Sequence, residues 1–205
     1  MDSIIFDLDG TLWDPIDTVL AAWNSRMHEL QVKREPLTRM EFAGTMGLQM
    51  DEISRQFFPG LADEERRQIV NQCCRFEQTM LKERGGHLYA DVEQVLEILS
   101  LRYKLYIVSN CEDGYIESLY HFHGLNRYFS DYENPGRTGL SKGGNINLIM
   151  ERNNLLSPIY VGDTEGDLVA ARYAGIPFVY ASYGFGSVHE YEHRIETFAD
   201  LLDIR

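Results

Sequence analysis

The stretch Ile4-Ile5-Phe6-Asp7-Leu8-Asp9-Gly10-Thr11 decides the fold of this chain. Three apolar residues that favour strands lead into two carboxylates, and a glycine follows, which predicts a buried strand that ends abruptly. Because side chains alternate along a strand, Asp7 and Asp9 are expected on one side and Leu8 on the other. Gly10 lets the backbone turn away at once. The sequence therefore predicts two acids presented together at the carboxyl end of a strand, where open α/β sheets bind their ligands.

Two regions of different pattern follow this stretch. From about residue 14 to residue 86, apolar residues recur at helical spacing and strand signals are almost absent, as in the face formed by Val19, Trp23, Met27 and Leu30. The clearest helix there begins at Asp63, and its apolar stripe is predicted to be Ile69, Cys73, Phe76 and Met80. From residue 87 onward, strands expected at 105–108, 128–129, 159–161 and 177–180 alternate with helices expected at 92–101, 114–123, 142–153, 167–174 and 198–202.

This alternation predicts an α/β fold, with a Rossmann-like parallel sheet covered by helices on both faces. The opening strand belongs to that sheet, although a long helical region separates it from the next strand. We therefore expect an α/β core domain formed by residues 1–13 and 87–205, and an inserted all-α domain formed by residues 14–86. The insert is expected to cover the end of the sheet from which Asp7 and Asp9 emerge.

Composition narrows the classes of partner. The formal net charge is −13, so a nucleic-acid backbone would be repelled and nucleic acid is not expected as a partner. No apolar run approaches the length of a membrane span, and the first residues do not resemble a secretion signal, so no membrane partner is expected. The three cysteines, two of them adjacent, do not suggest a disulfide framework, which favours a cytoplasmic location.

Two further segments carry groups suited to phosphate. Ser109 and Asn110 follow a predicted strand, and a hydroxyl with backbone amides at a strand-to-helix junction forms a phosphate cradle, although such residues also simply cap helices. Lys142 begins a helix after the loop 134–139, where a fixed ammonium can neutralise phosphate charge. Arg137, in the same loop, is the competing cation.

A last segment adds two acids at the end of another predicted strand. In Gly162-Asp163-Thr164-Glu165-Gly166-Asp167, the two aspartates are four residues apart. Mg²⁺ prefers hard oxygen ligands, often one or two carboxylates completed by water and substrate phosphate. Asp163 is therefore a candidate metal ligand, and Asp167 is either a further one or the N-cap of its helix.

Taken in order, these four segments resemble motifs I to IV of the haloacid dehalogenase-like hydrolase superfamily. Asp7-Leu8-Asp9-Gly10-Thr11 resembles Asp-x-Asp-Gly-Thr, and the acids at 163 and 167 resemble Gly-Asp-x-x-x-Asp. The helical region between motifs I and II is similar to the cap of the helical-cap (C1) subfamily. Tyr183-Gly184-Phe185-Gly186 resembles a loop of its phosphoglycolate phosphatase-like members. One departure is Gly143, because many relatives have proline after the motif III lysine.

The resemblance implies a role for each motif residue. Asp7 would be the nucleophile that forms an aspartyl-phosphate, and Asp9 the general acid and base. The phosphoryl group would be bound by Ser109, Asn110 and Lys142. The cofactor would be Mg²⁺, with Asp7, the Asp9 carbonyl and Asp163 as direct ligands, and Asp167 binding a coordinated water or orienting Lys142.

The resulting functional prediction is a Mg²⁺-dependent, phosphoglycolate phosphatase-like enzyme. It would hydrolyse a small-molecule phosphate ester, as a monomer or homodimer. Dehalogenase and phosphonate-cleaving relatives lack an acid at the position of Asp9, so its presence favours phosphoryl transfer. Two alternatives remain: a sugar-phosphate mutase of the β-phosphoglucomutase type, and a non-catalytic protein that binds a phosphorylated ligand.

Overall fold

The computed structural model describes residues 1–204, and its centre is a six-stranded parallel sheet in the order β5-β4-β1-β6-β7-β8. In the middle, Phe6 of β1 lies opposite Ile107 of β4 and Val161 of β6. The predicted α/β class is therefore confirmed. The strands are β1 (Ser3–Phe6), β4 (Lys104–Val108), β5 (Phe129–Glu133), β6 (Pro158–Gly162), β7 (Phe178–Ala181) and β8 (His193–Ile195).

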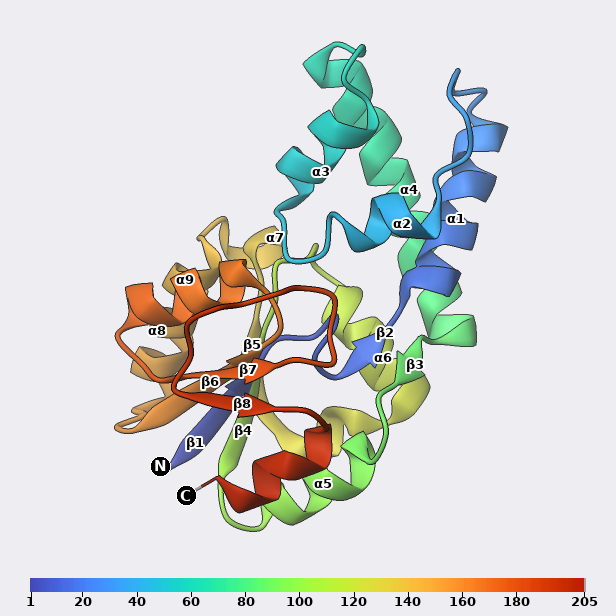
Figure 1. Cartoon of the computed structure of the whole chain (residues 1–205). Coiled ribbons are helices and arrows are strands. Elements are labelled where there is room, and N and C mark those ends of the chain that lie inside the picture. The colour runs from blue at the N-terminus through green and yellow to red at the C-terminus, as the bar shows by residue number, and fades with distance from the viewer. Residues whose placement is uncertain (205) are drawn as a thin grey trace.

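Helices cover both faces of this sheet because alternate residues of β1 face opposite ways (Figure 1). Ile4 and Phe6 join one buried apolar cluster, which includes residues of α5 (Val92–Ser100) and α6 (Tyr115–His123). Ile5 joins the other, with residues of α8 (Lys142–Asn153) and α9 (Glu165–Ala174). The remaining short elements are α7 (Pro135–Thr138) and two 3-10 helices, η1 (Leu125–Tyr128) and η2 (Phe198–Asp203).

Four helices stand together outside the sheet, beyond the end at which β1 finishes (Figure 1). They are α1 (Ile16–Glu29), α2 (Arg39–Ala43), α3 (Met50–Phe57) and α4 (Asp63–Arg84), and we call residues 16–84 the helical segment. The chain leaves and re-enters the α/β part through a short antiparallel ribbon, in which β2 (Trp13–Asp14) pairs with β3 (His87–Leu88). The division into domains at residues 14 and 86 remains a prediction.

An aromatic cluster forms the centre of the helical segment. The rings of Trp23, Phe42 and Phe57 meet edge to face, with centroids 5.0 to 5.7 Å apart. All three side chains are buried. Edge-to-face aromatic pairs add to the free energy gained from apolar burial, so these rings hold α1, α2 and α3 together.

The buried face of α4 differs from the predicted one. Ile69 and Cys73 are buried as expected, but Phe76 and Met80 are only partly buried. Because α4 contacts α1, α3 and α6, its buried surface is wider and rotated relative to a single stripe. This surface comprises Arg66, Ile69, Val70, Cys73, Cys74, Glu77 and Leu81. The burial of the Glu77 carboxyl was not predicted.

Two other differences concern the sheet edges. The strand expected at 128–129 is β5, which begins one residue later and runs over Phe129–Glu133, while Tyr128 ends η1. The edge strand β8 was not predicted. Both edge strands carry polar residues such as Asp131 and Arg194, and β8 has only three residues, so their apolar alternation is weak. The expected terminal helix is the 3-10 helix η2.

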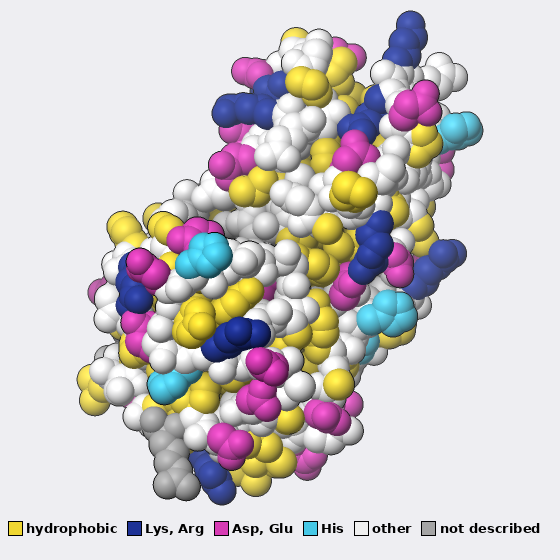
Figure 2. Space-filling view, viewed as in Figure 1, with side chains coloured by type: hydrophobic (Ala, Val, Ile, Leu, Met, Phe, Trp, Pro, Cys, Tyr) yellow, Lys and Arg dark blue, Asp and Glu magenta, His cyan; other side chains and the backbone are white. Residues whose placement is uncertain are grey.

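The surface has mixed charge, and the cysteines are buried. On the face in Figure 2, Lys and Arg side chains are interspersed with Asp and Glu, rather than forming a continuous basic surface. Cys73, Cys74 and Cys111 are free thiols, all buried. Within residues 1–204, none of the helices combines the length and apolar character needed to cross a bilayer.

Replacement of Phe57 by alanine tests whether the helical segment is a separate folding unit. Removing a buried phenylalanine ring costs about 3–5 kcal/mol of unfolding free energy. If the segment unfolds on its own, amide hydrogen exchange in Phe57→Ala will accelerate in α1–α4 and stay slow in β1, β4 and β6. Equal acceleration in both parts would mean that the chain unfolds as one unit and would contradict the division.

Candidate active site

A buried ammonium connects two carboxylates beyond the end of β1. Lys142 Nζ donates to Asp7 Oδ1 at 2.7 Å and to Asp167 Oδ1 at 2.5 Å. Asp7 directly follows β1, Lys142 is the first residue of α8, and Asp167 lies in the first turn of α9. All three side chains are almost completely buried. Parallel strands that end at one edge bring together residues 135 positions apart in the chain.

Asp163 is held beside this cluster by the backbone of two loops. Its Oδ2 accepts a hydrogen bond from Phe185 N at 2.6 Å. A Cβ atom at Gly10 would overlap Asp163 Oδ2, and one at Gly184 would overlap Asp163 Cβ. Gly10 also has a positive φ of 81°, which favours glycine. Both glycines are therefore needed for the close approach of these loops to the carboxylate.

The acidic cluster has the chemistry of a divalent cation site. One oxygen from each of Asp7, Asp163 and Asp167 lies within 4.8 Å of the others. Three carboxylates face one ammonium, and the buried Oδ1 of Asp163 has no hydrogen-bond partner among the described residues. A hard cation would satisfy both the unpaired oxygen and the excess negative charge. These residues therefore fit a divalent metal ion.

Burial and mutual repulsion shape the proton affinities of the cluster. Burial, followed by the charge of Asp167, raises the pKa of Asp7, and the ammonium of Lys142 works against this rise. Burial and the charges of Asp167 and Asp7 likewise raise the pKa of Asp163. Burial alone would lower the pKa of Lys142, but the carboxylates of Asp167 and Asp7 outweigh it and raise that pKa. Lys142 therefore stays charged and compensates its acidic neighbours.

Asp9 lines a cavity between the α/β part and the helical segment. Its Oδ1 accepts hydrogen bonds from Trp13 Nε1 at 2.7 Å and Tyr115 Oη at 3.1 Å. Burial, followed by the charge of Asp7, raises the pKa of the Asp9 carboxyl to about 7, while these two donors lower it. A carboxyl with this pKa can give and take a proton near neutral pH.

The predicted phosphate-binding residues lie at neighbouring strand ends. Ser109 follows β4, next to β1, and is buried. The Asn110 side chain donates to Gly47 O at 2.9 Å, so it ties the end of β4 to the loop after α2. The competing cation Arg137 is directed elsewhere: its Nε lies 3.8 Å from Glu133 and its guanidinium stacks on Tyr132. Lys142, not Arg137, contacts Asp7.

Sequence reasoning missed the groups that orient Asp9. Trp13 and Tyr115 were not predicted as site residues. Tyr115 reaches Asp9 across 106 residues, for which there is no local signal, whereas Trp13 is only four residues from Asp9 and could have been considered. Glu77, which lines the same cavity, was also missed. A local signal for Glu77 exists in the sequence. Glu77 is four residues from both Cys73 and Leu81, so on a helix it lies on the same apolar face as these two residues.

Replacement of Lys142 by methionine will reveal how much the cluster depends on its cation. The variant leaves two facing buried carboxylates without a counter-charge, and losing one partner of a buried ion pair costs about 3–5 kcal/mol. We expect a large fall in the unfolding free energy in metal-free buffer, measured by denaturant titration. The exposed Lys33→Met variant should be close to wild type. Equal stability of both variants would exclude this electrostatic role.

Comparison with known proteins identifies the family of the chain. The profile of the haloacid dehalogenase-like hydrolase family matches residues 4–181. The phosphoglycolate phosphatase of Aliivibrio fischeri is 29% identical over 196 residues, covering 89% of this chain and 84% of that protein. A predicted phosphoglycolate phosphatase from Haemophilus somnus has a TM-score of 0.83 at 22% identity, covering 99% of this chain and 97% of the other.

The fold extends to relatives of still lower identity. A haloacid dehalogenase-like hydrolase from Bacteroides fragilis has a TM-score of 0.85 at 17% identity, over 98% of this chain and all of the other. The family match covers most of the chain, including each of the four motif segments. The chain is a member of the haloacid dehalogenase-like hydrolase family.

Proposed function

We propose that the protein is a Mg²⁺-dependent phosphatase that hydrolyses a small phosphate monoester through an aspartyl-phosphate, with the chemistry of its phosphoglycolate phosphatase relatives. The observation that carries the proposal is the placement of two unlike carboxyls at one strand end. Asp7 lies in a buried cluster with the Lys142 ammonium, whereas Asp9 borders a cavity and accepts hydrogen bonds from the neutral donors Trp13 and Tyr115. A nucleophile and a general acid need this difference.

Asp7 is the proposed nucleophile. Its Oδ1 accepts a hydrogen bond from Lys142 Nζ at 2.7 Å, which orients the carboxylate and favours its ionised form. A carboxylate oxygen forms a bond to phosphorus as the ester P–O bond breaks. Water then attacks the phosphorus of the aspartyl-phosphate, the bond to Asp7 breaks, and inorganic phosphate leaves.

Asp9 is the proposed general acid and base. Trp13 and Tyr115 both donate to Oδ1, so Oδ2 is the oxygen left to carry a proton. In the first step this proton passes to the leaving alkoxide. In the second step Asp9 takes a proton from the attacking water, which returns the site to its starting state.

The remaining residues bind and neutralise the phosphoryl group. We assign Ser109, Asn110 and Lys142 to this task, since they lie at the ends of adjacent strands or at a helix N-terminus. Asp7, the Asp9 carbonyl, Asp163 and Asp167 would hold Mg²⁺ directly or through water. When bound, Mg²⁺ supplies charge stabilisation to the phosphoryl oxygens.

The helical segment is proposed to act as a cap. It contributes several walls of the cavity that Asp9 borders, and the Asn110–Gly47 hydrogen bond joins it to the end of β4. A cap in this position excludes water from the nucleophile and contacts the leaving group of the ester. This assignment uses the predicted boundaries at residues 14 and 86.

Replacement of Asp7 by asparagine tests the nucleophile. Because no covalent intermediate can form, kcat for p-nitrophenyl phosphate should fall about a thousandfold or more. Acid quench and mass spectrometry should find phosphate on the Asp7 peptide of the wild-type enzyme only. The exposed Asp203→Asn variant is the control and should turn over normally. Near-normal turnover by Asp7→Asn would refute the assignment.

Metal removal tests the cofactor. Dialysis against EDTA should abolish hydrolysis, and Mg²⁺ should restore it, because the carboxylate cluster would otherwise repel the phosphoryl oxygens. Full activity in EDTA would contradict metal dependence.

Phosphorus NMR of β-glucose 1-phosphate incubated with the Mg²⁺-restored enzyme separates a phosphatase from a mutase. Free phosphate agrees with a phosphatase, whereas glucose 6-phosphate would indicate a mutase.

A further inference from the structure

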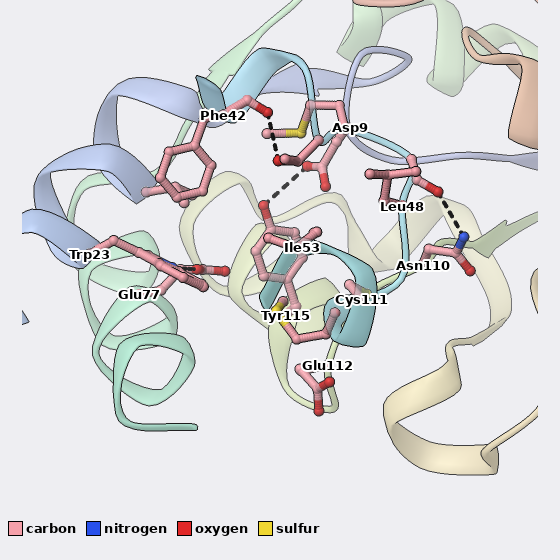
Figure 3. Close-up of a pocket in the computed structure, with 15 residues that line it drawn as sticks. Asp9, Trp23, Phe42, Leu48, Ile53, Glu77, Asn110, Cys111, Glu112 and Tyr115 are labelled. Carbon is pink, nitrogen blue, oxygen red and sulfur yellow. Dashed lines mark hydrogen bonds between the residues drawn. The ribbon is translucent and has the colours of Figure 1, made fainter. Parts of the chain in front are cut away.

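A small cavity separates the reacting carboxyls from the core of the helical segment (Figure 3). It encloses about 50 Å³, and Asp9 forms part of its wall. By this measure one water needs about 10–15 Å³, so the space suits a group of only a few heavy atoms. Because Asp9 is the proposed general acid, the cavity begins where the leaving oxygen would be. A role for this cavity in substrate choice therefore rests on the proposed phosphatase function.

One carboxyl group stands out on the far wall of this cavity. Glu77, on α4, is only 5% exposed, and its Oε2 accepts a hydrogen bond from Trp23 Nε1. Figure 3 shows the Glu77 carboxyl directed away from α4, toward Ile53 and Tyr115. Most other groups that the helical segment contributes to the cavity are apolar, such as Val19 and Phe42. Burying a charged carboxylate among apolar groups costs desolvation free energy, which a bound cation would offset.

The cavity is lined by carboxyl groups and, among the described residues, by no basic side chain. Asp9, Glu77 and Glu112 line it, and its lining within the described chain includes no Lys, Arg or His. Burial raises the pKa of Glu77 to about 8, although the Trp23 hydrogen bond lowers it, which agrees with a carboxyl that has no cationic neighbour in this lining. A carboxylate on the leaving group would find no counter-charge here. An ammonium would meet the Glu77 carboxyl, and its charge would favour the ionised form of that group.

We propose that Glu77 selects phosphate monoesters of small amino alcohols, whose ammonium group binds beside the Glu77 carboxylate, in the cavity. The cavity holds the carbon chain and the cation, while the phosphoryl group lies at Asp7. Phosphoglycolate, which carries a carboxylate at the corresponding position, is disfavoured. This preference separates the chain from relatives that are named for phosphoglycolate, although the chemistry at phosphorus is shared.

Three two-carbon esters test the proposal directly in the wild-type enzyme. 2-Aminoethyl, 2-hydroxyethyl and carboxymethyl phosphate (phosphoglycolate) have the same phosphoryl group and similar length, and differ in the charge at the far end. We expect kcat/KM, measured as released phosphate, to fall in that order, with about a hundredfold between the first and the last. A highest value for the hydroxyethyl or carboxymethyl ester would overturn the proposal.

The Glu77→Gln variant tests the assignment to one side chain. Glutamine keeps the shape and can still accept from Trp23, but it removes the charge. The aminoethyl-to-carboxymethyl ratio of kcat/KM should fall at least about tenfold, whereas Glu65→Gln, at an exposed position of the same helix, should leave it unchanged. An unchanged ratio in a Glu77→Gln enzyme with wild-type circular dichroism would refute the role of Glu77.

Hydrolysis of p-nitrophenyl phosphate distinguishes a failure of the selectivity proposal from a failure of the phosphatase proposal. If the wild-type enzyme hydrolyses this aryl ester but prefers carboxymethyl phosphate, the selectivity proposal is wrong and the phosphatase proposal stands. If it hydrolyses neither the aryl ester nor any of the three alkyl esters in the presence of Mg²⁺, the phosphatase proposal itself fails. Should Glu77→Gln not fold, the wild-type series alone decides the selectivity.

Discussion

The salt bridge of Lys142 with Asp7 and Asp167 is the interaction on which the site depends. It places an ammonium with almost no solvent contact between two carboxylates, at 2.7 and 2.5 Å. Taking these groups out of water is expensive, and each partner left alone would be an uncompensated buried charge. The bridge is therefore a constraint as much as a stabiliser: it fixes the ends of β1, α8 and α9 in one arrangement. Asp163, held by Phe185 N, adds the negative charge that a cation would balance.

The fold makes this arrangement possible because the residues that directly follow parallel strands lie together at one edge of the sheet. Beyond that edge, the helical segment closes over Asp9 and leaves a small cavity. The two sides of the site have opposite electrostatic character. Around Asp7 a fixed cation compensates the acids, whereas around Glu77 the described residues offer none. The first environment suits the transfer of a dianionic phosphoryl group, and the second suits a leaving group of positive charge.

Much of this could be predicted from the sequence because its signals are local. The strand ending in Asp7 and Asp9, and the acids at 163 and 167, carry patterns that need no tertiary information. The choice between Lys142 and Arg137 could not be made locally, since it depends on where helix α8 begins relative to β1. The burial of Glu77 could not be predicted from local sequence alone. It depends on Trp23, 54 residues away, and on the contacts of α4 with three helices. Helical periodicity predicted helix α4 and two of its buried residues, Ile69 and Cys73, but not the rest of the buried face.

A crystal structure grown with Mg²⁺ and beryllium fluoride, which mimics a phosphoryl group on a carboxylate, would decide whether these acids work together on one phosphoryl group. We predict that beryllium fluoride will be bound to a carboxylate oxygen of Asp7 and that a metal ion will lie between Asp7 and Asp163. Lys142 should still contact Asp7. A structure in which Asp7 and Asp163 face apart, or in which beryllium fluoride is bound away from Asp7, would contradict this assignment.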